Sequence, residues 1–260
     1  MIQRAIRLKT APEIKKMKRA GRIVAEVLEG MEELMRPGVR TSKLDEFAEA
    51  TIRSRGAIPS FKGYPHLSGD PRKAFPASVC ASLNDEIVHG IPSSRVLREG
   101  DIIGIDCGVI LDGWHGDAAR TYAVGRISDE AAALMEATRE ALARGVAAIE
   151  AGKPLGRVGH AIQSHVESLG YSVVREFVGH GIGADMHEAP NVPNHGSASS
   201  GPVVEVGLVI AIEPMVNAGG FEARVDGDGW TVRTADGSLS AHFEHTVAVT
   251  ERGVELLTAL

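Results

Sequence analysis

The chain has 260 residues, 43% of them hydrophobic and 24% charged, which allows a sizeable core and excludes a disordered class of protein. Its net charge of −6 provides no basic field for nucleic acid or a membrane surface. No apolar run approaches the roughly 20 residues that cross a bilayer, and no signal-peptide core is visible. Two cysteines without metal-type spacing, Cys80 and Cys107, indicate reduced thiols in a cytoplasmic protein.

Hydrophobic periodicity divides the chain into helical and strand-rich stretches. A capping box from Thr10 to Glu13 begins the first helix, whose apolar face continues to Leu34 before Pro37 ends it. A second helix begins at Ser42. The pattern predicts further helices over residues 128–149 and 155–169, with strands and loops over 57–125 and after 170.

Two pairs of segments resemble one another across the chain. In the first pair a predicted helix lies between glycines eighteen positions apart, at 38/56 and at 152/170. "GDIIGID" and "GLVIAIE" each place a carboxylate after a five-residue strand, at Asp106 and at Glu213. Chance similarity is the alternative, but the coincident carboxylates favour a duplicated α/β unit. We therefore predict one domain over residues 1–260, with half-repeats at about 10–125 and 126–255. A pseudo-two-fold relation between the halves would bring Asp106 and Glu213 to one central cleft.

The stretch "IDCGVILDGWHGDAART" places three aspartates among residues that are typical of strands, where aspartate is rare. The pair Asp112-Gly113 predicts a two-residue type I′ hairpin turn. In that register Asp106 and Asp117 share one face of the hairpin as diagonal neighbours, with backbones roughly 7–8 Å apart. The turn explains Asp112, whereas Asp106 and Asp117 need a different reason.

The second half adds polar residues beside apolar strands, namely His180, His187, Glu213, Glu244 and His245. A single buried histidine is ordinarily a core residue, and a glutamate at a strand end is ordinarily solvated. Four carboxylates gathered with a histidine would instead have raised pKa values unless cations compensate them. Oxygen-rich ligands with one imidazole suit manganese, iron(II) or cobalt at least as well as zinc.

These residues lie in motifs through which the chain resembles the type I methionine aminopeptidases over nearly its full length. The motifs are "FPASVCASLNDEIVHGIP", the hairpin stretch above, "GHGIGADMHEAP", "IEPMVNAGG" and "DGWTVRTADGSLSAHFEHTVAVT". The resemblance implies an α/β (α+β) pita-bread fold, with two pseudo-two-fold halves and a central curved antiparallel sheet flanked by helices. It also implies a metalloexopeptidase that removes the initiator methionine when the second residue is small.

The resemblance further implies two divalent metal ions (cobalt, manganese, iron(II) or zinc) and assigns their ligands. These would be Asp106 on one ion, Asp117 and Glu244 bridging both, and His180 and Glu213 on the second. The nucleophile would be a bridging water or hydroxide. Glu213 would serve as base and then as proton donor to the leaving amine.

Further roles are carried over from the same motifs. His187 would stabilise the oxyanion and hold the scissile amide, and His89 would contact the second substrate residue. The methionine side chain would lie in an apolar slot, which without the resemblance we would interpret as ordinary core. Its residues would be Tyr64, Phe75, Cys80, Met186 and Trp230. A monovalent cation, sodium or potassium, would bind at Asn84, Glu86 and Ser240.

The sequence departs from the family at two places. Where the family commonly has Gly-Tyr-His-Gly-Phe, this chain has "GYPHLSGDPRKAF", which is eight residues longer. We predict that residues 65–74 form a polar surface loop at the mouth of the pocket, with His66 inside it. Met186 stands where an aromatic residue is common. Both departures concern substrate preference rather than the reaction.

Three other kinds of protein share parts of this sequence pattern. The same fold serves enzymes that cut next to proline, but these usually carry a large extra domain. A non-enzymatic pita-bread binding protein would lose metal ligands, and a dinuclear phosphoesterase would need a phosphate-binding Arg/Lys cluster. We expect the partners to be nascent polypeptide N-termini and the ribosome, without direct binding of nucleic acid or membrane, and we expect a monomer.

Overall fold

The computed structural model describes residues 5–260, and its helices and strands follow the predicted order. The helices are α1 (Ala11–Met31), α2 (Thr41–Ser54), α3 (Asp129–Ala147) and α4 (Gly156–Ser168), with single 3-10 turns η1 (Glu32–Leu34) and η2 (Pro71–Lys73). The strands are β1 (Ile58–Pro59), β2 (Val79–Leu83), β3 (Glu86–Val88), β4 (Ile102–Leu111), β5 (Trp114–Ala123), β6 (Ser172–Val173), β7 (Gly179–Gly181), β8 (Glu188–Val192), β9 (Val209–Ile212), β10 (Met215–Asn217), β11 (Ala223–Val225), β12 (Val232–Thr234), β13 (Ser240–His242), β14 (His245–Thr250) and β15 (Gly253–Leu256). No helix within residues 5–260 is long and apolar enough to cross a membrane.

The four predicted helices are confirmed, with small differences at their ends. The Glu13 carboxylate accepts hydrogen bonds from the Thr10 N–H at 2.8 Å and the Thr10 hydroxyl at 2.9 Å, which closes the first turn of α1. The α-helical part of the first helix stops at Met31, and the chain continues to Leu34 as η1. Helix α2 begins at Thr41, one residue before the predicted start.

The hairpin of β4 and β5 has the predicted register, with Leu111 opposite Trp114 and Asp117 opposite Gly108. Asp112 and Gly113 have φ values of 52° and 79°, as a type I′ turn requires. Asp106 pairs with Ala119, two positions from Asp117 on β5. The two carboxylates therefore leave the same face of the hairpin.

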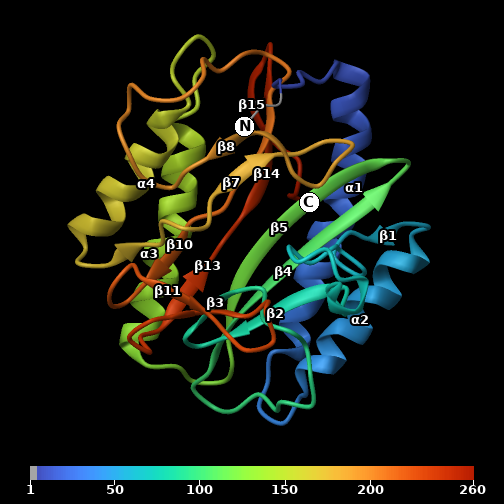
Figure 1. Ribbon diagram of the computed structural model, residues 1–260, viewed down its shortest axis with the longest axis vertical. Helices are drawn as coiled ribbons and strands as arrows, with labels where there is room; N and C mark the ends of the chain where they lie inside the picture. The colour runs from blue at the N-terminus through green and yellow to red at the C-terminus, as the bar shows by residue number, and fades with distance from the viewer. Residues whose placement is uncertain (1–4) are drawn as a thin grey trace.

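Every strand pairing in the fold is antiparallel within the described residues. The hairpin joins β1 and β2 in the first half, and the second half forms a sheet in the order β15-β14-β9-β7-β8. Two three-stranded sheets, β13-β10-β6 and β11-β12-β3, complete the structure. Figure 1 shows α1 and α2 beside one half and α3 and α4 beside the other, with the strands between them.

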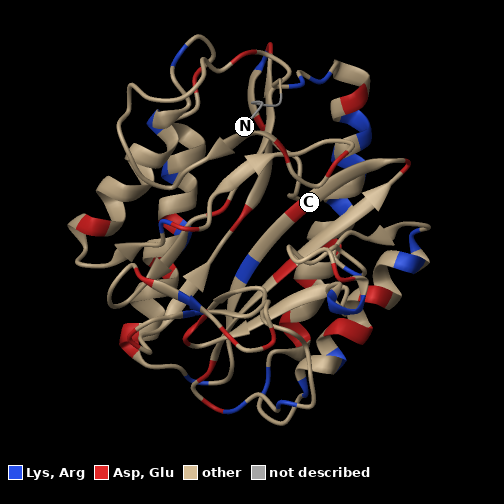
Figure 2. Cartoon of the chain, viewed as in Figure 1, with Lys and Arg blue, Asp and Glu red and all other residues tan. Residues whose placement is uncertain are grey.

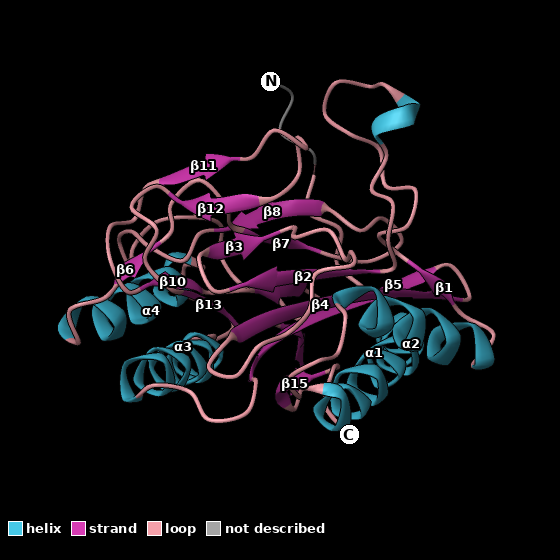
Figure 3. Ribbon diagram, turned by 90° about the horizontal axis from the view of Figure 1, so that it is seen from below, coloured by secondary structure: helices cyan, strands magenta, loops and turns pink. Residues whose placement is uncertain are grey.

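All four helices lie on one side of the strands, which leaves the other side for loops and short strands (Figure 3). Helix α1 lies directly on β5, because a Cβ added at Gly116 would come within 2.7 Å of the backbone nitrogen of Gly21. Acidic positions interrupt the central strands, whereas most other charges lie on helices and loops (Figure 2). Gly100 and Gly207 have nearly equal φ values of 90° and 95°, which favours the predicted duplication without testing it.

Candidate active site

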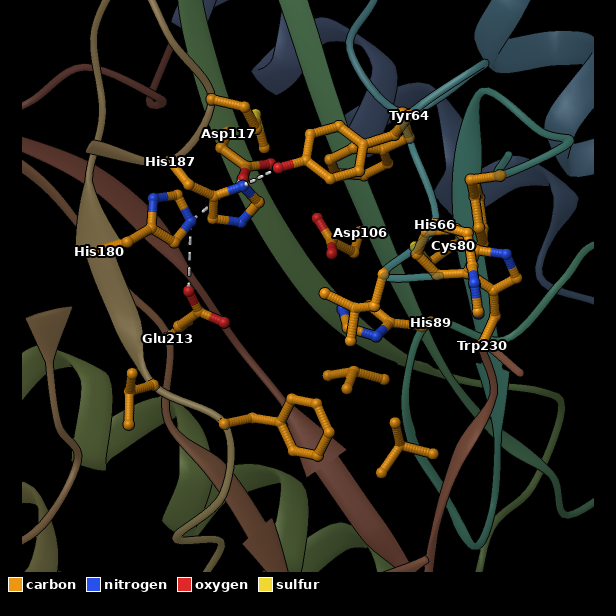
Figure 4. A pocket seen from close by; sticks show the side chains of 18 of the residues that line it. Tyr64, His66, Cys80, His89, Asp106, Asp117, His180, His187, Glu213 and Trp230 are labelled. Carbon is orange, nitrogen blue, oxygen red and sulfur yellow. Dashed lines mark hydrogen bonds and ion pairs between the residues drawn. The ribbon is translucent and has the colours of Figure 1, made fainter. Parts of the chain in front are cut away.

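Residues from both halves of the chain meet at one cavity of about 420 Å³. The hairpin contributes Asp106 and Asp117, while the second half contributes His180 from β7, Glu213 after β9 and Glu244 before β14. Figure 4 shows Asp106, Asp117, His180 and Glu213 pointing toward one another around this space. The structure thus brings together all five residues that the sequence singled out as metal ligands.

Hydrogen bonds to the main-chain groups of Asp117 and Glu244 join the two halves beside the carboxylates. The Asp117 N–H donates to the Thr246 hydroxyl at 3.0 Å, and that hydroxyl donates to the Asp117 carbonyl at 2.7 Å. The Glu244 N–H donates to the Ala119 carbonyl at 2.9 Å. These bonds fix β5 to the segment that carries Glu244 and Thr246, and so hold the main chains of Asp117 and Glu244 at a set spacing.

The distances fit a shared cation site. His180 Nε2 lies 3.5 Å from Glu213 Oε1 and 3.9 Å from Asp117 Oδ2. One ligand atom each from Asp117, His180 and Glu244 lies within 4.8 Å of the others. The Nδ1 of His180 is 2.9 Å from the Gly181 carbonyl, to which it donates, so its Nε2 presents a lone pair to the carboxylates.

The carboxyl groups are electrostatically unfavourable without a counter-ion. Burial raises the pKa of Asp106 to about 7. Burial, reinforced by the Glu244 and Asp106 charges, raises the pKa of Asp117 well above its ordinary value, and burial likewise raises the pKa of Glu213 and Glu244. Within residues 5–260, Asp106 Oδ1, Asp117 Oδ1 and Glu244 Oε1 are buried without a hydrogen-bond partner. Such oxygens are expected to have partners, so they fit the donor set of a divalent metal site.

The rest of the cavity is mainly apolar. All five residues predicted for the methionine slot line it, namely Tyr64, Phe75, Cys80, Met186 and Trp230. Trp230 packs edge-on against Phe75, with ring centroids 5.2 Å apart. Phe75 and Cys80 are 2% and 4% exposed, so the slot is closed from solvent on that side. A thioether would fit this soft, polarizable wall.

Two further histidines border the cavity as predicted. His187 lies against His180, with ring centroids 4.2 Å apart, and its Nδ1 is 2.6 Å from the Tyr64 hydroxyl. His89 packs edge-on against Phe177 at 5.7 Å and against Trp230 at 6.3 Å. Burial lowers the pKa of His89 to about 4, so its ring is neutral at pH 7.

The model of metallopeptidase family M24 matches residues 15–251, which include every one of these residues. The chain belongs to this family. Methionine aminopeptidase from Clostridium acetobutylicum is 51% identical over 96% of this chain and 98% of its own length. The crystal structure of methionine aminopeptidase from Thermotoga maritima is 41% identical and has a TM-score of 0.94, covering 98% of this chain and 100% of that one.

This metallopeptidase also resembles longer members of its fold. Xaa-Pro dipeptidase from Bacillus anthracis has a TM-score of 0.75 at 26% identity, covering 96% of this chain but 61% of that one. The pita-bread fold and the resemblance to methionine aminopeptidases are thereby confirmed. The greater length of the dipeptidase agrees with the expectation that enzymes acting next to proline carry additional sequence.

The extra residues of this metallopeptidase form a loop at the cavity mouth. Its ends meet, because the Phe75 N–H donates to the Tyr64 carbonyl at 2.9 Å. The His66 ring donates from Nε2 to the Gly229 carbonyl at 3.1 Å, and the Trp230 indole donates to the Lys73 carbonyl at 2.8 Å. Figure 3 shows this segment, with the η2 turn, projecting beyond the strands. The loop is therefore attached to a wall of the slot.

The residues predicted for a monovalent cation are only partly suited to it. The Asn84 carbonyl accepts a hydrogen bond from the Ser240 N–H at 2.8 Å, so these two are neighbours. The Glu86 carboxylate is already bound by Arg95 and Arg233, each at 2.6 Å. Since that charge is balanced by two guanidinium groups, a cation there would depend on main-chain carbonyls. The site stays a prediction.

Sequence reasoning missed two residues of the site. His242 is buried, and its Nε2 lies 3.9 Å from Glu213 Oε2. Phe177 lines the cavity and holds the His89 ring. His242 lies two positions before Glu244, in the motif "AHFEHT", so the motif carried a signal for it. No comparable signal marked Phe177, which precedes "VGHGIG" as an ordinary apolar residue.

Proposed function

We propose that this chain removes the N-terminal methionine from nascent proteins and peptides whose second residue is small. The proposal rests on one observation above all: four carboxylates and one imidazole from both halves of the chain line the same cavity as an apolar slot. Its substrates would be the N-termini of new polypeptides in the cytoplasm. Contact with the ribosome and a monomeric state are parts of the same proposal.

Two divalent ions would be held by Asp106, Asp117, His180, Glu213 and Glu244. When bound, such ions supply an activated water and a Lewis acid for the scissile carbonyl. They would also compensate the charge of the carboxylates, whose pKa values are raised mainly by burial and, for Asp117, also by the neighbouring carboxylates. The substrate's free amine would lie among these carboxylates, which would limit cleavage to the first peptide bond.

Glu213 is the best placed residue for proton transfer. Its Oε1 lies 3.5 Å from His180 Nε2 and its Oε2 lies 3.9 Å from His242 Nε2, and the residue lines the cavity beside the other ligands. We propose that it takes a proton from the attacking water and returns it to the leaving amine. His187 would donate a hydrogen bond to the developing oxyanion.

Selectivity would come from the slot and from His89. Tyr64, Phe75, Cys80, Met186 and Trp230 would surround the methionine thioether. The His89 ring cannot retreat from the second substrate residue, because Phe177 and Trp230 pack against it. A large second residue would therefore be excluded.

The experiment compares Met-Ala-Ser, Ala-Pro peptides and an aryl phosphate as substrates. The protein is first stripped with a chelator and then given manganese, cobalt, iron(II) or zinc separately. We expect metal-dependent cleavage of Met-Ala-Ser alone. Cleavage of Ala-Pro peptides in preference to Met-Ala-Ser would assign the chain to the proline-related class instead, and full activity of the stripped protein would contradict the metal mechanism.

A further inference from the structure

Tyr64 and His187 form a hydrogen bond that the roles given above do not use. The Tyr64 hydroxyl lies 2.6 Å from His187 Nδ1, although 123 positions separate the two residues. Their rings meet edge to face, with centroids 5.4 Å apart. Figure 4 shows the hydroxyl directed at the imidazole of His187. As a wall of the methionine slot, Tyr64 would need only its ring.

The direction of this bond decides which nitrogen of His187 carries the proton. A phenol hydroxyl is a good donor, and the unprotonated imidazole nitrogen is a basic acceptor. When Nδ1 accepts from Tyr64, the proton of the neutral ring is on Nε2. An oxyanion or a scissile amide carbonyl needs a donor at that position, whereas the other tautomer would present a lone pair.

Both partners are held in place by further contacts of their own segments. The Tyr64 N–H donates to the Phe61 carbonyl at 2.8 Å, and the Tyr64 carbonyl accepts from Phe75. On the other side, the Glu188 carboxylate, next to His187, binds the buried Lys9 ammonium at 2.8 Å. The segment carrying each ring is thus fixed, so the hydrogen bond can orient the imidazole rather than follow it.

We propose that Tyr64 is a positioning residue for His187, whose hydroxyl donates to Nδ1 and thereby keeps the Nε2–H directed at the substrate. The inference rests on the oxyanion role proposed for His187. It adds that Tyr64, the residue just before the mouth loop, serves the chemical step as well as the slot.

Tyr64→Phe tests this, because it keeps the aromatic wall and removes only the donor. We expect kcat for Met-Ala-Ser to fall about tenfold, equivalent to about 1.4 kcal/mol, with KM unchanged. In a His187→Ala background the same substitution should cause no further loss. In the metal-free protein, ¹H–¹⁵N correlations of labelled histidines should show His187 protonated on Nε2, and Tyr64→Phe should weaken that preference.

Tyr122→Phe is the matched control, since it also removes a 2.6 Å tyrosine bond, to the Leu28 carbonyl, but lies outside the cavity. It should lower stability and leave kcat unchanged. A raised KM with normal kcat for Tyr64→Phe, independent losses in the double variant, or an Nδ1-protonated His187 would each overturn the positioning role. Full activity of His187→Ala would instead refute the oxyanion role proposed for His187, and the positioning role with it.

Discussion

Removing the divalent metal should make the stability of this protein fall as the pH rises above about 7.5. Burial raises the pKa of Asp106 from 3.8 to about 7, and it raises the pKa values of Asp117, Glu213 and Glu244 as well. The folded protein therefore retains protons that the unfolded chain has already lost. A raised carboxyl pKa stabilises the fold at low pH, and this contribution disappears as the pH rises through the folded-state pKa.

The magnitude follows from the number of retained protons. At pH 7 the Asp106 carboxyl is half protonated, so it lowers the free energy of unfolding by about 0.7 kcal/mol for each pH unit of increase. Each carboxyl that is still fully protonated lowers it by about 1.4 kcal/mol for each pH unit. Buried histidines act in the opposite sense, because burial lowers the pKa of His180 to about 3 and that of His89 to about 4. Histidines of the unfolded chain are half protonated at about pH 6.5, so this opposing contribution ends only about one pH unit higher, and the carboxyl effect is isolated above about pH 7.5.

Urea unfolding of chelated and manganese-loaded protein at pH 7.5, 8.0 and 8.5 measures the effect. The stripped protein should lose stability across this range, and manganese at about 100 times its Kd should add about 2.7 kcal/mol. Asp106→Asn should reduce the dependence of the free energy of unfolding on pH in the stripped protein. Asp112→Asn, at an exposed residue paired with Arg19, should leave it unchanged. A free energy of unfolding that stays constant or increases with pH in stripped protein would refute the argument.

Three further predictions concern the reaction. Asp117→Ala should reduce activity by orders of magnitude more than Asp112→Ala, because only Asp117 faces the cavity; an inactive Asp112→Ala would contradict the proposed site. His180→Ala should have a lower affinity for one metal, and excess metal should partly restore its activity. His187→Ala should retain the metal stoichiometry, but its kcat should fall by a factor of about 10²–10³. Calorimetric metal titration beside steady-state rates distinguishes the two outcomes. Replacing residues 65–74 by a short turn should preserve the fold and metal binding but change KM for longer peptides, and circular dichroism showing unfolding would refute this.

Local signals predicted much of the fold. The hairpin register followed from Asp112-Gly113 and the alternation around it, because a two-residue turn fixes every pair of opposed residues. The capping box at Thr10 located the start of α1, although the change from α-helix to 3-10 geometry after Met31 had no signal in the periodicity. Motif resemblance then selected the ligand residues, and the structure brings them to one cavity.

By itself the sequence determined the elements, the hairpin and the set of chemically important residues, because turn chemistry and side-chain period act between near neighbours. Only the tertiary structure decided how those residues contact one another. The bond between Tyr64 and His187, the attachment of His66 to Gly229 and the approach of His242 to Glu213 join distant segments. Such contacts depend on how the two halves pack, and packing is a property of the whole core that no short stretch of sequence carries.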